Sequence, residues 1–262
     1  MTKEVFGTRE WAASNENIYW GCRHGCKYCY SRAESVRHGK SPAEFDTPVL
    51  RKRKENKKFG KRNGTIMFPT AHDLHPNDID VWLPFLERML KAGNKVLIVS
   101  KPHPSCVRTM CSKLKKYKDN ILFRFTIGSA NKAILRFWEP KAPDYLDRII
   151  SLKHAYYEDF NTSISCEPML DDNILKVIED TRDYVTDYIW LGKVNFLTKR
   201  LEVNGFLNEE TERMAKQLLE WQSDEKILSL YELLKDHPKI KWKESIKKVV
   251  GLKIPTKAGL DA

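Results

Sequence analysis

The sequence contains no long apolar run, because no stretch of apolar residues is longer than four, as at positions 96–99. A helix that spans a membrane needs about 20 such residues, so a helical membrane protein is excluded. The first residues, MTKEVFGTREW, also lack an apolar segment, and we expect no cleaved secretory signal and a cytoplasmic protein. Apolar residues make up 41% of the chain, which is enough for a sizeable core, and charged residues make up 31%. This composition excludes global disorder.

The sequence shows no internal repeat and instead alternates short β-rich runs with longer helical patterns. Predicted strands cover residues 17–20, 65–68, 95–100, 121–127, 161–166 and 188–191, and predicted helices cover residues 31–37, 79–92, 106–118, 144–157 and 173–182. Such alternation is typical of a parallel sheet. We predict a partial (βα)6 barrel of the TIM type over residues 1–195 and a mainly helical C-terminal extension, residues 196–262, packed on it. In such folds the chemistry takes place at the C-terminal ends of the strands.

Positive charge is in excess, since 46 Lys and Arg against 35 Asp and Glu give a net charge of +11. This balance favours a polyanionic partner such as nucleic acid, although a soluble basic protein without such a partner has it too. No recognised DNA- or RNA-binding module is present. The segment from Arg51 to Arg62, RKRKENKKFGKR, holds eight basic residues and one acid, and would follow a phosphate backbone or form an exposed loop. In the basic C-terminal stretch KIKWKESIKKVVGLK, Trp242 would contact single-stranded nucleic acid or belong to the core.

Three of the six cysteines, Cys22, Cys26 and Cys29, lie within eight residues in a C-x3-C-x2-C spacing. In a cytosolic chain this pattern indicates metal binding rather than a disulfide framework. Three thiolates on a [4Fe–4S] cube leave one of its four irons without a protein ligand, and that iron can bind another molecule. The neighbouring Arg23 and Lys27 would favour thiolates.

Two other interpretations of the cysteine loop stay open at this point. A structural zinc site would need a fourth ligand, for which His24 or His38 is available. A disulfide with one spare thiol would need an oxidising compartment, which nothing in the sequence indicates.

The loop GCRHGCKYCYSR resembles the signature of the radical S-adenosylmethionine (radical SAM) superfamily, both in spacing and in the aromatic Tyr28 before the last cysteine. Four further segments resemble the spore photoproduct lyase-like branch, whose members are often labelled DNA repair photolyases: IMFPTAHDLHP, VLIVSKPHP, FTIGSANKAILRFWEPKAPDYLDRI and TSISCEPMLDD. The resemblance implies a [4Fe–4S] cluster on the three cysteines, with SAM chelated by the open iron. The reduced cluster would cleave SAM to a 5′-deoxyadenosyl radical that abstracts hydrogen from a substrate. An electron donor such as flavodoxin or ferredoxin would then be needed.

The same resemblance implies roles for residues at the strand ends. Lys101 would hold the SAM carboxylate as a point charge. Thr70 and Asp73 would accept from the SAM amino group, with a cap or turn as the alternative for Asp73. Thr126 and Ser165 would bond the ribose or the methionine moiety, unless they are polar core residues bonded to the backbone.

Further residues are candidates with less defined roles. Arg148 would pair with Glu139, reach the SAM carboxylate or lie on a helix surface. Glu167 would contact cofactor or substrate, and Tyr28 would contribute its backbone to adenine recognition.

Histidines and cysteines outside the loop complete the candidate set. His72, His75 and His103 would line the pocket, with a second metal site as the alternative. Cys106 and Cys166 would donate hydrogen to a substrate radical or remain inert in the core.

The chain departs from the family in one respect. Spore photoproduct lyase carries a hydrogen-donating cysteine just past its second strand, and here residues 68–73, FPTAHD, contain none. The resemblance therefore supports radical initiation more than it supports photoproduct repair. Our first hypothesis for the substrate is a nucleic acid base, for repair or modification. The alternatives are a radical SAM enzyme for a peptide, protein or small molecule, and a non-catalytic iron–sulfur or zinc protein that binds nucleic acid.

Overall fold

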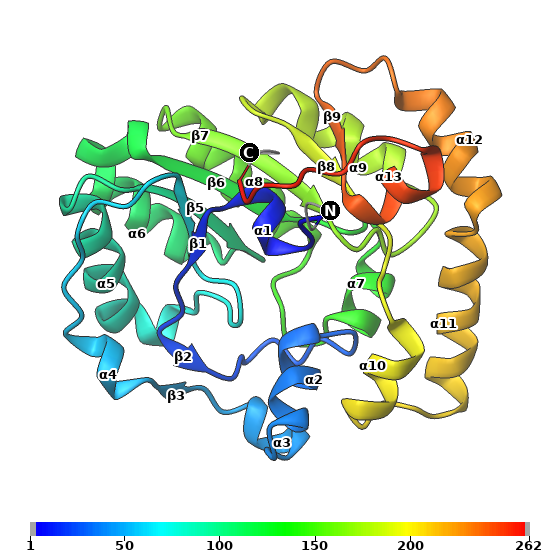
Figure 1. The fold of residues 1–262 in the computed structure, drawn as a ribbon, viewed down its shortest axis with the longest axis horizontal. Helices are drawn as coiled ribbons and strands as arrows, with labels where there is room; N and C mark the ends of the chain where they lie inside the picture. The colour runs from blue at the N-terminus through cyan, green and yellow to red at the C-terminus, as the bar shows by residue number, and fades with distance from the viewer. Residues whose placement is uncertain (1–3, 260–262) are drawn as a thin grey trace.

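The computed structural model describes residues 4–259 and is built around one parallel sheet (Figure 1). The strand order is β1-β4-β5-β6-β7-β8-β9, and every pair of neighbours runs parallel. The strands are β1 Ser14–Asn15, β4 Thr65–Met67, β5 Lys95–Ser100, β6 Ile121–Thr126, β7 Asn161–Cys166, β8 Ile189–Leu191 and β9 Ile240–Trp242. The predicted α/β architecture is confirmed, with β1 and β9 as the edges of the sheet.

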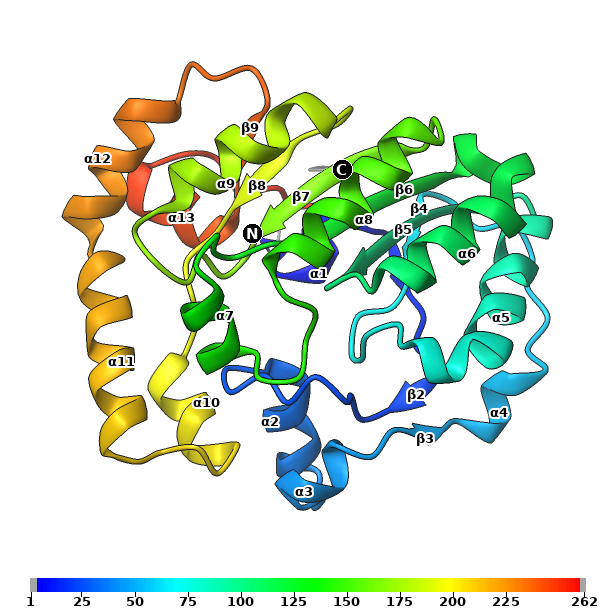
Figure 2. The ribbon, with the colours of Figure 1, turned by 180° about the vertical axis from the view of Figure 1, so that it is seen from behind.

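Helices connect the strands and cover the sheet. Figure 2 shows α5, α6, α8 and α9 side by side over one face. In α5, Trp82, Phe85, Leu86 and Met89 are fully buried, and their spacing of three and four residues turns one apolar stripe toward the sheet. No described helix is both long and apolar enough to cross a bilayer. The helices are α1 Thr8–Trp11, α2 Tyr30–Arg37, α3 Pro42–Phe45, α4 Lys52–Glu55, α5 Ile79–Lys91, α6 Pro104–Leu114, α7 Lys132–Trp138, α8 Tyr145–Tyr157, α9 Ile174–Thr181, α10 Leu197–Val203, α11 Glu209–Trp221, α12 Asp224–Leu234 and α13 Glu244–Val250, with 3-10 turns at Pro76–Asp78, Lys115–Asn120 and Arg182–Tyr184.

The first strand differs from the prediction. Residues 17–20 do not open the parallel sheet, because β1 takes that place beside β4, and β2 (Tyr19–Trp20) pairs antiparallel with β3 (Val49–Leu50). The chain leaves the sheet at Asn17, whose side-chain oxygen accepts the backbone N–H groups of Thr70 and Ala71. The amide side chain thus replaces strand pairing at this point, and β2 carries the cysteine loop away from the sheet.

The C-terminal part is mainly helical but returns to the sheet. β9 pairs with β8 after α10, α11 and α12, and α13 follows it. Three residues between lysines are too short a run to predict as a strand. Trp242 of β9 is buried against Tyr231, with ring centroids 5.2 Å apart, and therefore belongs to the core. The boundary at residue 195 stays a prediction, and the sheet continues across it.

The basic segment from Arg51 to Arg62 is anchored by ion pairs to the buried Glu16. The Glu16 carboxylate accepts from Lys54 and Arg62, both at 2.7 Å, and from Lys57. Burial alone would raise the pKa of Glu16, but these hydrogen bonds lower it below its ordinary value. Of the other basic side chains in the segment, Arg51 donates to the backbone oxygen of Tyr19. Four more are exposed: Lys52, Arg53, Lys58 and Lys61.

Removing the charge of Glu16 would leave three cations without their shared carboxylate. We expect Glu16→Gln to lower the free energy of unfolding by about 2 kcal/mol, less than for a fully buried pair because the three cations are partly exposed. Urea unfolding of the metal-free chain measures this change. Glu34→Gln is the matched control, since its partners Arg37 and His38 lie at the surface. Equal losses in the two variants would contradict the anchoring role.

Candidate active site

A cavity of about 700 Å³ lies at the C-terminal ends of the strands. Parallel strands bring the residues that follow them to one edge of the sheet, and this is where the cavity opens. The cysteine loop, carried there by β2, forms the opposite wall. The candidate residues that line the cavity are Cys22, Cys26, Cys29, Tyr28, Thr70, Asp73, Lys101, Thr126, Ser165 and Glu167.

The cysteine loop is held in place mainly by its backbone. Gly21 has φ +91°, and a Cβ there would lie 2.6 Å from the backbone oxygen of Phe45, so only glycine fits. The next residue, Cys22, donates its N–H to that same oxygen at 2.8 Å. Farther along, the Lys27 N–H donates to the Trp138 oxygen at 2.9 Å. These backbone contacts hold the loop against the ends of α3 and α7.

Asn204, the C-cap residue of α10, clamps the loop from the C-terminal part of the chain. Its buried Nδ2 donates to the backbone oxygens of Lys27, at 2.9 Å, and Cys29, at 3.0 Å. This role could not be predicted from the sequence, because a helix-capping asparagine is common and the partners of Asn204 are 175 and 177 positions away.

The three sulfurs differ in their surroundings. Cys29 is the N-cap residue of α2, and its Sγ accepts the Arg32 N–H at 3.4 Å. Burial raises the pKa of Cys22 to about 12 and that of Cys26 well above its usual range. These two thiols would lose their protons when a metal takes their place. Three soft sulfur donors on one cavity wall fit an iron–sulfur cluster.

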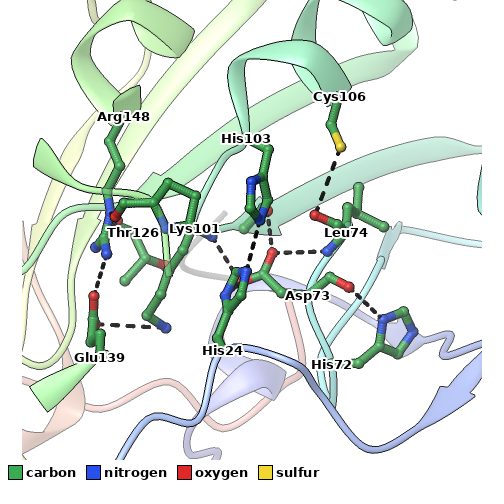
Figure 3. Close-up of polar contacts among 12 residues, drawn as sticks. His24, His72, Asp73, Leu74, Lys101, His103, Cys106, Thr126, Glu139 and Arg148 are labelled. Atoms are coloured by element: carbon green, nitrogen blue, oxygen red, sulfur yellow. Dashed lines mark hydrogen bonds and ion pairs between the residues drawn. The ribbon is translucent and has the colours of Figure 1, made fainter. Parts of the chain in front are cut away.

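Asp73 joins the cysteine loop to the end of β5 (Figure 3). Its Oδ2 accepts the Lys101 N–H at 2.9 Å and lies 3.2 Å from His24 Nδ1. Its Oδ1 accepts the Leu74 N–H at 2.9 Å and the Ser100 hydroxyl. Burial would raise the pKa of Asp73, but His24, Lys101 and Ser100 hold it far below its ordinary value. Both oxygens therefore already have protein partners, which matches the turn-organising alternative for this residue.

The other histidines occupy two separate places. The His24 and His103 Nε2 atoms lie 3.0 Å apart, and the His75 ring packs on His103 with centroids 4.9 Å apart. His72 instead accepts the Ile18 N–H at 3.1 Å and packs against Tyr19. Among residues 4–259, no group of three His, Cys, Asp or Glu side chains is arranged to hold a single metal ion.

A second buried network surrounds Glu139. Its carboxylate accepts from Arg148 Nη2, and Lys101 Nζ lies 3.8 Å away (Figure 3). The Tyr28 hydroxyl donates to the same carboxylate. Arg148 also donates to the backbone oxygens of Pro143, at 2.9 Å, and Thr126, at 3.1 Å. Arg148 is fully buried, so the pairing with Glu139 is the alternative that the structure contains.

Lys101 remains a cation at the cavity wall. Burial opposes its charge, but the Cys26 thiol, Tyr28 and Glu139 together raise the pKa of Lys101 well above its ordinary value. The side chain is 16% exposed, toward the cavity that it lines.

The hydroxyl candidates face the same space. Thr126 and Ser165 are register partners on β6 and β7, which places them side by side at the ends of these strands. Thr70 follows β4, and its Oγ1 accepts from Asn17 Nδ2 at 2.7 Å. Sequence reasoning did not find Asn17, although it fixes the turn that carries Thr70.

The two candidate hydrogen donors are buried away from the cavity. Cys106 lies in α6 with its sulfur 3.8 Å from the Leu74 oxygen, and Cys166 ends β7. Neither is among the described residues that line the cavity.

The structure predicts that Asp73 keeps the cysteine loop in place. In Asp73→Asn one amide oxygen replaces two carboxylate oxygens, so at least one buried N–H loses its acceptor. We expect a loss of about 2 kcal/mol in unfolding free energy and lower iron content after anaerobic reconstitution. Asp171→Asn is the control, since Asp171 accepts from Ser129 and the Asn173 N–H at another turn. Normal iron uptake in Asp73→Asn would contradict this role.

Because His72 is buried, the stability of the fold should depend on pH in the acid range. Burial lowers the pKa of His72 from 6.5 to about 4, so between these values the unfolded chain binds a proton that the folded chain does not. Stability should therefore fall as pH drops from 6.5 to 4, with about 3 kcal/mol from this group. In His72→Gln, urea unfolding at a series of pH values should show a correspondingly shallower dependence. The exposed His38→Gln should keep the original slope, and the same slope in all three proteins would contradict the assignment.

The fold has known counterparts, although no protein-family model and no curated protein matches the sequence. A variant of spore photoproduct lyase with bound AdoMet and dinucleoside spore photoproduct has a TM-score of 0.56 at 10% identity, over 92% of this chain and 78% of that chain. Spore photoproduct lyase complexed with the dinucleoside spore photoproduct has a TM-score of 0.54 at 10% identity, over 86% and 74%. Streptococcus suis SuiB bound to S-adenosylmethionine has a TM-score of 0.52 at 11% identity, over 94% of this chain and 54% of that one. The fold expected from the sequence, that of spore photoproduct lyase and other radical SAM enzymes, is confirmed.

Proposed function

We propose that the chain is a radical SAM enzyme that binds a [4Fe–4S] cluster through Cys22, Cys26 and Cys29. The observation that carries the proposal is that these three sulfurs and Lys101 line one cavity at the C-terminal edge of the sheet. The structures that share this fold include proteins with AdoMet or S-adenosylmethionine bound, which supports the same cofactor here. When bound, the cluster would supply the electron that cleaves SAM to a 5′-deoxyadenosyl radical.

The chain's own residues would hold SAM in this cavity. Lys101 would pair with its carboxylate, and Glu139, between Tyr28 and Arg148, would keep Lys101 in position. Thr126 and Ser165 would bond the ribose or methionine oxygens.

Four other candidates complete the proposed site. Thr70 would bond the SAM amino group, and the Tyr28 backbone would recognise adenine. Glu167 lines the cavity and would contact cofactor or substrate. Asp73 would act as a positioning residue, because its oxygens are already bonded within the protein.

A nucleic acid base is the substrate class that we propose. The net charge of +11 supports a polyanion, and spore photoproduct lyase, which shares the fold, binds a dinucleoside. The repair of that photoproduct is not part of the proposal, since residues 69–73 hold no cysteine. A peptide is the second candidate, because SuiB of the same fold has been solved with a precursor peptide. The electron would come from a donor such as flavodoxin or ferredoxin.

The cluster assignment predicts how cysteine variants behave. After anaerobic reconstitution with iron and sulfide, the unaltered chain should hold about four irons and form 5′-deoxyadenosine from SAM with a strong reductant. Cys26→Ala should lose both properties, and Cys111→Ala, a buried cysteine of α6, should keep both. Bound zinc without SAM cleavage would favour the non-catalytic binding protein.

Lys101 is tested separately from the cluster. Lys101→Met keeps the volume of the side chain and removes its charge. We expect normal iron content and SAM binding weakened about tenfold or more, measured by equilibrium dialysis. Unchanged SAM affinity would contradict the carboxylate contact.

A further inference from the structure

One wall of the cavity has no part in the proposed cofactor site. It is formed by Phe6 and Gly7 with Thr8 and Trp11 of α1, by residues 193–196 and Arg200 of α10, and by Glu244 and Lys248 of α13. Figure 1 shows α1 and α13 next to each other, and the Glu244 N–H donates to Glu10 at 3.1 Å. A ligand on this wall would share the cavity with the proposed SAM site.

Phe196 is an exposed aromatic ring held in a costly conformation. It is 76% exposed, lines the cavity and has φ +55°, a left-handed value that a bulky residue rarely adopts. The backbone before it is fixed, because the Lys193 N–H donates to Ser245 Oγ at 3.0 Å and the Val194 N–H to Gln222 Oε1 at 2.7 Å. The fold thus presents an apolar ring to solvent at the opening of the cavity.

Two cations accompany exposed rings on this wall. The Arg200 guanidinium lies 5.9 Å from the Phe196 ring centroid, and Lys248 Nζ lies 4.4 Å from the centroid of Phe6, which is 45% exposed. All four residues line the cavity. Exposed rings paired with cations are the groups with which proteins stack bases and hold phosphates of single strands.

Glu244 of the same wall has a buried carboxylate oxygen without a hydrogen-bond donor among the described residues. The residue is 6% exposed, and among the described residues its Oε2 has no hydrogen-bond partner. Its Oε1 lies 3.5 Å from Asn195 Nδ2.

The charge state of Glu244 follows from its neighbours. Lys243 is fully buried and lies 2.6 Å from Glu10 and 3.5 Å from Glu167. Burial raises the pKa of Glu10 to about 8. It opposes the charge on Glu244 as well, but Glu10 and Lys243 lower the pKa of Glu244. The lowered pKa keeps Glu244 an anion, and its unpartnered Oε2 can accept an N–H.

We propose that this wall binds one unpaired nucleobase of a single-stranded nucleic acid. The base stacks on Phe196, Arg200 and Lys248 contact the adjoining phosphates, and Glu244 Oε2 accepts an N–H from the edge of the base. The inference rests on the proposed function and names its substrate. It differs from the role considered for the segment from Arg51 to Arg62, because none of those residues is among the described lining residues.

Fluorescence anisotropy with the reconstituted full-length chain tests the proposal directly. The probes are a labelled single-stranded DNA of about eight nucleotides and an abasic strand of the same length. The base-containing strand should bind more tightly, and Phe196→Leu should weaken its binding about tenfold and that of the abasic strand little. Phe196→Tyr should retain binding. Arg200→Gln should reduce the salt slope by about 0.7, the value for one phosphate of a single strand.

Matched variants control for general effects. Tyr157→Leu removes a comparably exposed ring at the end of α8, which leads into the N-terminal end of β7. This variant should bind both strands with unchanged affinity. Glu244→Gln keeps the shape and should weaken binding of the base-containing strand only. Equal affinity for the two strands, or equal effects of Phe196→Leu and Tyr157→Leu, would overturn the proposal.

Failure of base binding at this wall can be distinguished from failure of the proposed radical SAM activity. SAM cleavage without DNA binding would overturn the base-binding wall and leave a radical SAM enzyme for another substrate, such as a peptide. DNA binding that depends on Phe196 in a chain that does not cleave SAM would support the wall and contradict the enzyme.

Discussion

The carboxylate of Asp73 is the contact on which the geometry of the site depends. It binds the end of β5 through the Lys101 N–H, its own turn through the Leu74 N–H, and the cysteine loop through His24. A buried carboxylate with this many donors is stable as an anion, and removing it would leave several polar groups unpaired. One side chain thus connects the turn after β4, the end of β5 and the cysteine loop, which are three parts of the cavity wall.

Segments outside the parallel sheet, near both ends of the chain, form the rest of the cavity wall. Parallel strands place Thr126, Ser165 and Lys101 at one end of the sheet, but the cysteine loop follows β2, which lies outside this sheet, and needs other support. Asn204 of the C-terminal part provides it, 175 and 177 residues from its two partners. The same C-terminal part contributes Phe196 and Glu244 to the cavity, so the extension forms part of the site.

The sequence was most informative where local chemistry decides the outcome. Alternating strands and helices predicted the parallel sheet, and the convergence of strand ends predicted that Lys101, Thr126 and Ser165 would meet. The spacing of the cysteines placed them in one loop. Long-range hydrogen bonds were beyond this reasoning: Asn17, Asn204 and Glu16 have ordinary sequence contexts, and their importance comes from partners that only the fold brings near. The position of β1 was missed for the same reason, because the side chain of Asn17 replaces a strand pairing.

In the proposed function, SAM would bind in this cavity to the one iron of the cluster that has no protein thiolate. The most direct measurement is the electron paramagnetic resonance spectrum of the reduced, reconstituted chain before and after SAM is added. We expect the spectrum of a [4Fe–4S] cluster that changes on addition of SAM, because SAM would bind the iron that lacks a cysteine. A spectrum that SAM leaves unchanged at saturating concentration would contradict it.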